Sequence, residues 1–225
     1  METHNKVWYL KRNRLFERAS EGAVEHMEHF FTQVEFAKRA QLFDQGDPAR
    51  MVYLLKRGKV RLSRITEDGK EITLAILGPG DIFGEEVAFH ELVRSTIATC
   101  LEDSLLCMSR AEDLFSIMTE QPICALNIAK YLKEQLDDAL ATVEDVAYLK
   151  VGDRLIKLFE RLAQEHGKPA AEGTLIDVKL TQAEIASLIG STRETVSLEM
   201  MNLARAGRIR VQKKYVVLPK ATATT

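Results

Sequence analysis

Few cysteines, no long apolar run and no catalytic pattern limit what this 225-residue chain can be. Its three cysteines are an odd number with spacings unlike those of a metal site, so we interpret them as small buried hydrophobic residues. An iron–sulfur cluster needs about four thiolates, and the N-terminal region contains none. Neither a secretory signal nor a bilayer-length apolar segment is present, which favours the reducing cytoplasm and no membrane partner.

The residue patterns of common enzymes are also missing. We find no paired nucleophile and base, no triad of metal ligands and no Walker loop, so we expect no enzymatic activity. His26 and His29 lie three residues apart, but no further ligands accompany them. This pair favours the charged face of a helix over half of a metal site, and we expect no metal.

Charge is divided unevenly along the chain, although the total is only −2. Residues 150–220 hold 13 Lys and Arg against 8 Asp and Glu, whereas the remainder holds 18 against 25. A basic half joined to an acidic half indicates that one half binds a polyanion and the other has a different task.

The texture of the sequence predicts four segments. Residues 1–20 form an entry segment packed by its aromatic residues, and Ser20 begins a short helix through about residue 31. Residues 21–110 hold short β-rich runs between glycine turns, including the hairpin turn Asp68-Gly69, which predicts a compact sandwich or barrel. Residues 111–148 contain a short helix, Pro122 and a long helix. Residues 149–225 contain a helix over 153–164, a loop to Gly173, a strand over 175–178 and the basic C-terminal region.

The long helix carries apolar residues at alternating intervals of three and four. This a/d seam covers about three heptads and predicts a self-pairing homodimer, with burial against the same chain as the alternative. The seam residues are Ala129, Leu132, Leu136, Ala139, Val143 and Val146. A second stripe of Leu126, Ile128 and Leu140 is expected to lie against the β-rich domain.

Residues 180–218 contain the most informative pattern, which is helix, tight turn, helix and basic hairpin. Thr181 and Glu184 have capping-box spacing, and Gly190 can adopt the positive φ that ends the first helix. Ser191 and Glu194 have the same spacing, so we expect a second capping box and a second helix to about Ala206. This order predicts a helix-turn-helix with a wing that binds DNA.

The second helix opens with residues that can contact base edges. Arg193 can donate twice to guanine, and Glu194 can accept from cytosine. Basic residues on the hairpin, Arg208, Arg210, Lys213 and Lys214, are expected to contact phosphates. A small helical hairpin with a solvated charged face is the alternative interpretation.

Residues 78–99 contain a second candidate site, in which glycines precede a short helical turn and Arg94-Ser95 follows it. Free amides at a helix start attract anions, and an arginine can clamp a phosphate with two hydrogen bonds. A nucleotide pocket and a glycine-rich turn with an Arg–Glu ion pair explain these residues equally well.

Both constellations, flanking a heptad helix, resemble the cAMP receptor protein/FNR (CRP/FNR) family of bacterial transcription regulators over about residues 15–218. GDIFGE followed by RST is similar to the family's phosphate-binding cassette, and TQAEIASLIGSTRETVS is similar to its DNA-binding signature. The resemblance implies an α+β fold with an N-terminal β-roll (jelly roll), a long dimerisation helix and a C-terminal winged helix-turn-helix.

The resemblance also implies roles for individual residues. Gly84 and Glu85 would face the ribose of a cyclic nucleotide, and Arg94 and Ser95 would bind its phosphate. In cAMP-responsive members a Thr-Ser pair on the dimer helix holds the adenine, and its place here is taken by Ala139 and Leu140, which argues against cAMP. Three possibilities remain: a cyclic nucleotide with different base contacts, another anionic effector, or a remnant pocket in which Arg94 and Glu85 pair and no effector is needed.

On the DNA side, Arg193 and Glu194 occupy the family's base-reading positions, and Leu198 stands where many members have arginine. The base-reading set is Arg193, Glu194, Ser191, Ser197 and Leu198, and the phosphate set is Thr181, Thr192, Thr195, Arg208, Lys213 and Lys214. We expect a palindromic operator whose half-site keeps one G·C pair but departs from the family's usual TGTGA.

The sequence therefore predicts a homodimeric, sequence-specific transcription regulator, with or without an effector. DNA, a second copy and RNA polymerase are the expected partners. A nucleotide-binding module that acts through protein partners and a haem or redox sensor are the alternatives.

Overall fold

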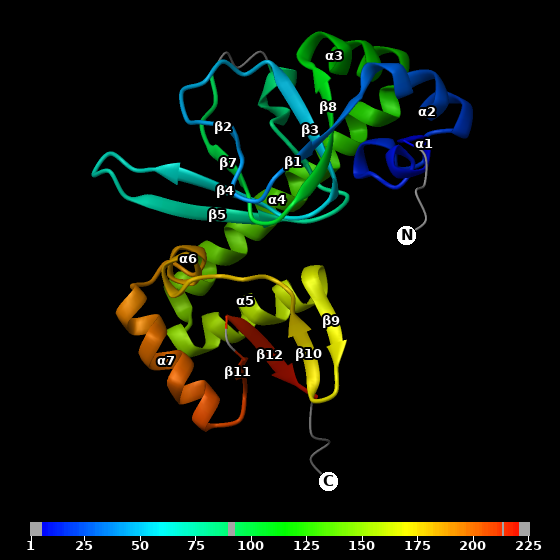
Figure 1. The fold of residues 1–225 in the computed structure, drawn as a ribbon. Coiled ribbons are helices and arrows are strands. Elements are labelled where there is room, and N and C mark those ends of the chain that lie inside the picture. Colours follow the sequence, from blue (N-terminus) through cyan, green and yellow to red (C-terminus); the bar gives the residue numbers. More distant parts are fainter. Residues whose placement is uncertain (1–5, 90–92, 213, 221–225) are drawn as a thin grey trace. The chain divides into compact units, whose positions relative to one another are not determined.

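The computed structural model describes residues 6–89, 93–212 and 214–220, which fall into two compact units divided within one long helix (Figure 1). Unit 1 ends at Asp137 and unit 2 begins at Asp138. The predicted order of β-rich region, long helix and helical C-terminal region is confirmed.

The described part of unit 1 contains two four-stranded antiparallel sheets. One has the order β1 (Thr32–Phe36), β8 (Ser104–Arg110), β3 (Met51–Arg57) and β6 (Ile82–Phe83). The other has the order β2 (Gln41–Phe43), β7 (Ile97–Cys100), β4 (Val60–Ile65) and β5 (Glu71–Leu77). Gly69, at φ 79°, lies in the turn between β4 and β5, which confirms the predicted hairpin.

Alternation along β3 explains why the β1-β8-β3-β6 sheet has two buried faces. Tyr53 and Leu55 pack into the core between the sheets, whereas Val52 and Leu54 pack into a second core formed with helices. Side chains at odd and even strand positions point to opposite faces, so one strand supplies both cores.

Helices cover the outer face of this sheet (Figure 1). They are α1 (Lys6–Leu10), α2 (Glu21–Met27), α3 (Ala111–Glu120) and the first half of α4 (Pro122–Tyr148), with short 3-10 turns η1 (Arg14–Phe16), η2 (Glu28–Phe30) and η3 (Glu85–Phe89). The Ser20 hydroxyl accepts from the Ala23 amide at 3.2 Å, which confirms the predicted start of α2.

The three cysteines are reduced and buried, as the sequence predicts. Burial raises the thiol pKa of Cys100 and Cys107, and it raises the pKa of Cys124 to about 11. These thiols therefore remain protonated near neutral pH and act as packing groups.

Unit 2 contains α5 (Val151–His166), α6 (Gln182–Leu188) and α7 (Arg193–Arg205) beside a sheet. Its described strands have the order β11 (Arg210–Gln212), β12 (Tyr215–Pro219), β10 (Gly173–Ile176) and β9 (Gly167–Ala170). The predicted apolar face of α5 is confirmed, because its leucines, Ile156 and Phe159 are buried.

Two sequence expectations for unit 2 are wrong. Residues 167–170 form strand β9 instead of a loop, and they tolerate Pro169 because β9 lies at the sheet edge. The strand expected over 175–178 lies two residues earlier, at Gly173–Ile176, where it pairs with both β9 and β12.

No described helix has the length and apolarity that would let it cross a bilayer. Among the same residues, His, Cys, Asp and Glu side chains do not gather in threes or more as a metal site requires.

Candidate nucleic-acid interface and effector pocket

The first helix of the predicted DNA-binding motif begins with a complete capping box. The Thr181 hydroxyl accepts from the Glu184 amide at 3.2 Å, and the Glu184 carboxylate accepts from the Thr181 amide at 2.7 Å. This arrangement confirms the predicted cap and satisfies amides that would otherwise lack partners at the helix start.

The turn between the helices is closed by backbone hydrogen bonds. Gly190 has φ 61°, as predicted, and the Ser191 amide donates to the Ala186 carbonyl at 2.9 Å. A β-carbon on Gly190 would lie 3.0 Å from the Val146 side chain, so a larger residue here would be strained both by the positive φ and by this close contact.

The predicted second capping box is wrong. Thr192, not Ser191, caps α7, because its hydroxyl accepts from the Thr195 amide at 3.2 Å. The Ser191 amide is already used to close the turn, so the helix starts one residue later and its third position is Thr195 instead of Glu194.

Helix α7 presents one buried and one exposed face. Val196, Met200 and Leu203 pack into unit 2, whereas Arg193 and Glu194 are exposed in the first turn. Leu198 is 54% exposed, and Ser191 and Ser197 are partly exposed. The five predicted base-reading residues therefore all reach the surface at the start of α7.

Sequence reasoning missed Met201, which is 48% exposed. Met201 lies seven residues after Glu194 and three after Leu198, so all three share one face of α7. That helical spacing was the signal that could have identified it. The face therefore continues from charged to apolar along the helix.

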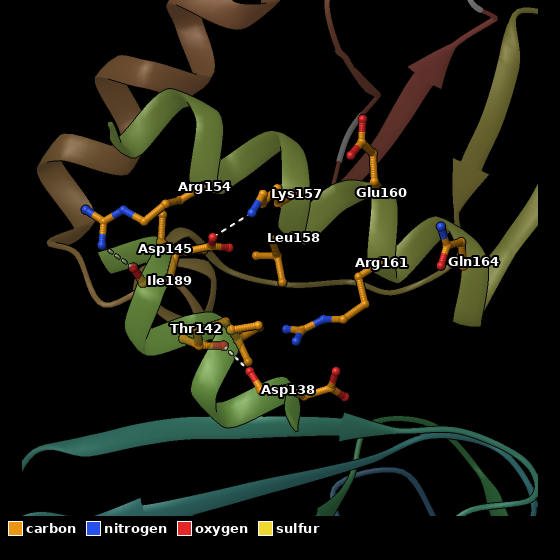
Figure 2. Close-up of a pocket in the computed structure, with 12 residues that line it drawn as sticks. Asp138, Thr142, Asp145, Arg154, Lys157, Leu158, Glu160, Arg161, Gln164 and Ile189 are labelled. Carbon is orange, nitrogen blue, oxygen red and sulfur yellow. Dashed lines mark hydrogen bonds and ion pairs between the residues drawn. The ribbon is translucent and has the colours of Figure 1, made fainter. Parts of the chain in front are cut away.

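Arg154 on α5 fixes the turn that precedes α7. Its Nη1 donates to the Ile189 carbonyl oxygen at 2.7 Å (Figure 2) and to the Gly190 carbonyl oxygen at 3.2 Å. Beside it, Lys157 Nζ donates to Asp145 of α4 at 2.6 Å. A cavity of about 280 Å³ lies between α5 and the last turns of α4, and its lining includes Arg154, Ile189, Lys157 and Asp145. The turn is thus tied directly to α5, and α5 to α4.

The predicted phosphate residues lie near the two helix starts and on the hairpin. The Thr181 and Thr192 hydroxyls serve as caps, and the Thr192 and Thr195 hydroxyls are 2.9 Å apart. Lys214 is exposed, and Lys213 lies outside the described residues. These residues remain predictions for phosphate contact.

The two arginines of the hairpin face acidic neighbours. Arg208 lies 3.8 Å from Asp153, and Arg210 forms an ion pair with Glu172. All four side chains are at least half exposed. Such exposed pairs contribute about 0–1 kcal/mol, so a phosphate can replace the carboxylate at little cost.

In the predicted effector pocket, Arg94 is enclosed by the chain and is only 2% exposed. Its Nη1 donates to Glu86 at 2.8 Å and to the Gly84 carbonyl at 3.2 Å, and its Nη2 donates to the Met51 carbonyl. The guanidinium carbon lies 4.2 Å from the centre of the Phe43 ring. The chain therefore already supplies a carboxylate and two carbonyls to this cation.

The sequence suggested that Arg94 pairs with Glu85. This expectation is wrong, because Arg94 pairs with Glu86. Glu85 begins η3, and Ser95 is exposed, with its carbonyl accepting from Arg64 at 3.0 Å. Gly84 has φ 76°, and a β-carbon there would lie 2.8 Å from Arg94 Nη1. Glycine is required here because the guanidinium fills the adjacent space.

The apolar stripe of α4 is only partly covered. Leu132 packs against the helical core, whereas Leu136, Val143 and Val146 are 58%, 66% and 46% exposed. Ala129 and Ala139 are also exposed. Of the second stripe, Ile128 is buried and Leu140 is 53% exposed. Leu126 is 65% exposed, so the expectation that it faces the β-rich domain is wrong.

Comparison with known proteins identifies both regions. Residues 33–121 match the cyclic nucleotide-binding domain, and residues 153–223 match the Crp-like helix-turn-helix domain. A global nitrogen regulator of Synechocystis sp. is 32% identical over 190 residues, which cover 84% of each chain. The chain belongs to the CRP/FNR family of transcription regulators.

Other CRP/FNR proteins agree over most of the chain. The cyclic AMP receptor protein of Thermus thermophilus is 31% identical over 202 residues, or 90% of each chain. The solved structure of another CRP/FNR-family regulator from Thermus thermophilus has a TM-score of 0.69 at 27% identity, over 84% of this chain and 94% of that one. The c-di-GMP-responsive regulator CLP of Xanthomonas campestris shares the fold, with a TM-score of 0.78 at 24% identity, over 90% of this chain and all of that one.

Proposed function

We propose that this CRP/FNR-family protein is a homodimer that binds a palindromic operator. The observation that carries the dimer is the exposed apolar stripe on α4, where Leu136 and Val143 each expose more than half of their side chains. Burying one such side chain stabilises association by about 1.5–3 kcal/mol, so a stripe over three heptads favours self-pairing.

A symmetric pair of α7 helices explains why the operator would be palindromic. Each copy presents exposed Arg193 and Glu194 in the first turn, where side chains reach base edges in the major groove. In the proposed contact, Arg193 donates to guanine and Glu194 accepts from cytosine. Leu198 and Met201 extend the same face and suit thymine methyl groups.

The direct test is to select binding sequences from random duplexes with the full-length protein and to measure its mass by sedimentation. We expect inverted repeats with one helical turn between half-site centres, bound by a dimer. Single-chain sedimentation at micromolar concentration, or selection of non-repeated sites, would contradict the proposal. RNA polymerase is the protein partner that we expect of such a regulator.

For the effector, we propose that Glu86 takes the place of a bound anion and that the protein binds its operator without a cyclic nucleotide. The 2.8 Å contact of Glu86 with a 98%-buried Arg94 supports this, because a cyclic phosphate at Arg94 would first have to displace the carboxylate. Ala139 and Leu140, which lack hydroxyls for the adenine, argue in the same direction.

Calorimetric titration tests this part separately. The panel includes cAMP and c-di-GMP, because relatives described as cAMP-activated and c-di-GMP-responsive are known. We expect no saturable heat from either nucleotide. Stoichiometric binding that is lost in Glu85→Gln, but kept in the control Glu67→Gln on the exposed β4–β5 turn, would establish a functional cyclic-nucleotide pocket instead.

A further inference from the structure

A second cavity of about 280 Å³ lies in unit 1, between the N-terminal segment and the β1-β8-β3-β6 sheet. None of Gly84, Glu85, Arg94 or Ser95 lines it. Its inner surface is apolar, because Leu10, Leu54, Leu55 and Cys107 are each at most 2% exposed. Trp8 and Tyr9 also line it, with their rings edge to face at 4.8 Å.

The charges of this cavity have one sign. Its lining residues include the cations Arg12 and Lys56 and no carboxylate. Lys56 Nζ donates to the neutral Gln33 amide oxygen at 2.6 Å and lies 3.7 Å from the centre of the Tyr9 ring. Arg12 lies over the Trp8 ring at 3.6 Å. Within the described residues, neither cation has a carboxylate partner.

The environment of Lys56 is consistent with an uncompensated charge. Burial lowers the pKa of its ammonium, and no neighbouring carboxylate reverses the effect. The cavity beside Arg154 in unit 2 has a different character. There Arg154, Lys157 and Arg161 are matched by Asp138, Asp145 and Glu160, so its charges do not select an anion.

We propose that the N-terminal cavity binds a small aromatic carboxylate. The ring would lie on Leu54 beside Trp8 and Tyr9, and the carboxylate would lie between Arg12 and Lys56. The volume is close to the lower end of ligand pockets and equals the share of roughly nine liquid water molecules, which suits one or two rings with a carboxylate. Aromatic walls with a few cations are the chemistry that such a ligand requires.

The site contacts a segment that is bound to α4. Asn13 Nδ2 donates to the Gly80 carbonyl at 3.1 Å, and both residues line the cavity. The next residue, Arg14, donates to Glu134 of α4 at 2.7 Å, and Asn127 of α4 donates to the Leu15 carbonyl at 2.9 Å. A ligand that contacts Arg12 would therefore also stabilise the attachment of this segment to α4.

Trp8 allows a direct test, because it is the only tryptophan of the chain and lies in the cavity wall. The full-length protein is titrated with benzoate and, separately, with its neutral analogue benzamide, while Trp8 fluorescence is recorded. We expect a saturable change with benzoate and binding about tenfold weaker with benzamide, because the neutral amide forms no ion pair with Arg12 or Lys56. No saturable change, or equal affinity for the two compounds, would overturn the proposal.

Substitutions of single cations test where the benzoate carboxylate binds. Lys56→Gln and the exposed Arg12→Gln should each weaken benzoate binding about tenfold while benzamide binding stays unchanged. Arg57→Gln is the matched control, because Arg57 is an exposed cation on the same strand that does not line the cavity. If Arg57→Gln weakens binding as much as Lys56→Gln does, the ligand is bound elsewhere, and the proposal is wrong.

A thermal unfolding curve of each variant shows that it folds, and Arg12→Gln remains informative if Lys56→Gln is unstable. The binding readout needs neither DNA nor a dimer. Failure of the operator proposal and failure of this site can therefore be told apart.

Discussion

Arg94 and Arg193 are the arginines of the two family motifs, yet their side chains differ in burial and in pairing. Arg94 is 2% exposed and bonded to Glu86 and two carbonyls. The Arg193 side chain is exposed in the first turn of α7 and, among the described residues, forms no hydrogen bond or ion pair. A buried cation must be paired by the chain, whereas an exposed one at a helix start remains available to an outside partner.

This difference shows that a family motif can be present in the sequence whether or not its charged residue is available to a ligand. The segment that resembles the family's phosphate-binding cassette has the expected arginine, Arg94, but Glu86 neutralises it. The DNA-binding signature has its arginine in an open position. A motif therefore indicates where a site lies, and the partners of its charged residues decide whether the site is open to a ligand.

Removing Arg94 should have the largest effect on stability. Arg94→Met leaves the Glu86 carboxylate, which is 17% exposed, without its partner, so we expect unit 1 to lose about 3 kcal/mol of unfolding free energy. Urea unfolding followed by Trp8 fluorescence measures it. The control Arg57→Met breaks a pair that is at least half exposed on both sides and should cost less than about 1 kcal/mol. Similar losses in the two variants would show that the buried pair is unimportant.

We expect the exposed Arg193 side chain to give high operator affinity only when two copies of the protein bind together. Leu136→Glu places a charge on the exposed stripe of α4, so we expect single chains in sedimentation and operator affinity reduced at least about 100-fold through lost avidity. Gln135→Glu adds the same charge beside the stripe and should leave a dimer. A Leu136→Glu variant that remains dimeric would place the interface elsewhere.

Arg193→Ala tests base recognition itself. We expect a loss of about 1–3 kcal/mol on the selected operator and relaxed preference at one base pair. Lys214→Ala, at an exposed hairpin cation, should instead weaken binding to all sequences and reduce the salt dependence by about one ion. If Arg193→Ala loses as much affinity for random DNA as for operator, Arg193 contacts phosphate only.

Leu198 should give the smallest effect. Its side chain is 54% exposed on the Glu194 face, so a thymine methyl contact would contribute about 0.8 kcal/mol. Replacing single thymines of the operator by uracil should weaken binding of the wild type at one position. Leu198→Ala should remove that sensitivity, and persistence of the sensitivity would assign the methyl contact to another residue, such as Met201.

Much of the fold was predictable, because local chemistry determines it. The Thr181–Glu184 capping box, the positive φ of Gly190 and the Asp68-Gly69 turn each depend on residues close in sequence. The apolar spacing of α5 was similarly sufficient. Strand β9 was missed because Pro169 argues against a strand unless that strand is known to lie at an edge.

Within the candidate sites, sequence failed where adjacent residues are chemically equivalent. Ser191 and Thr192 both have hydroxyls, and only the closure of the turn assigns the cap to Thr192. Glu85 and Glu86 are identical, and only the path of η3 directs Glu86 to Arg94. These choices depend on tertiary geometry that a linear pattern does not contain.

The most direct test of the account is operator affinity measured with protein that has been shown by mass spectrometry to be free of nucleotide. If Arg94 is satisfied by Glu86 while Arg193 is open, the protein should bind the selected operator tightly, and saturating cAMP or c-di-GMP should change the affinity less than about twofold, equivalent to under 0.5 kcal/mol. Binding that appears only when one of these nucleotides is added would contradict the account.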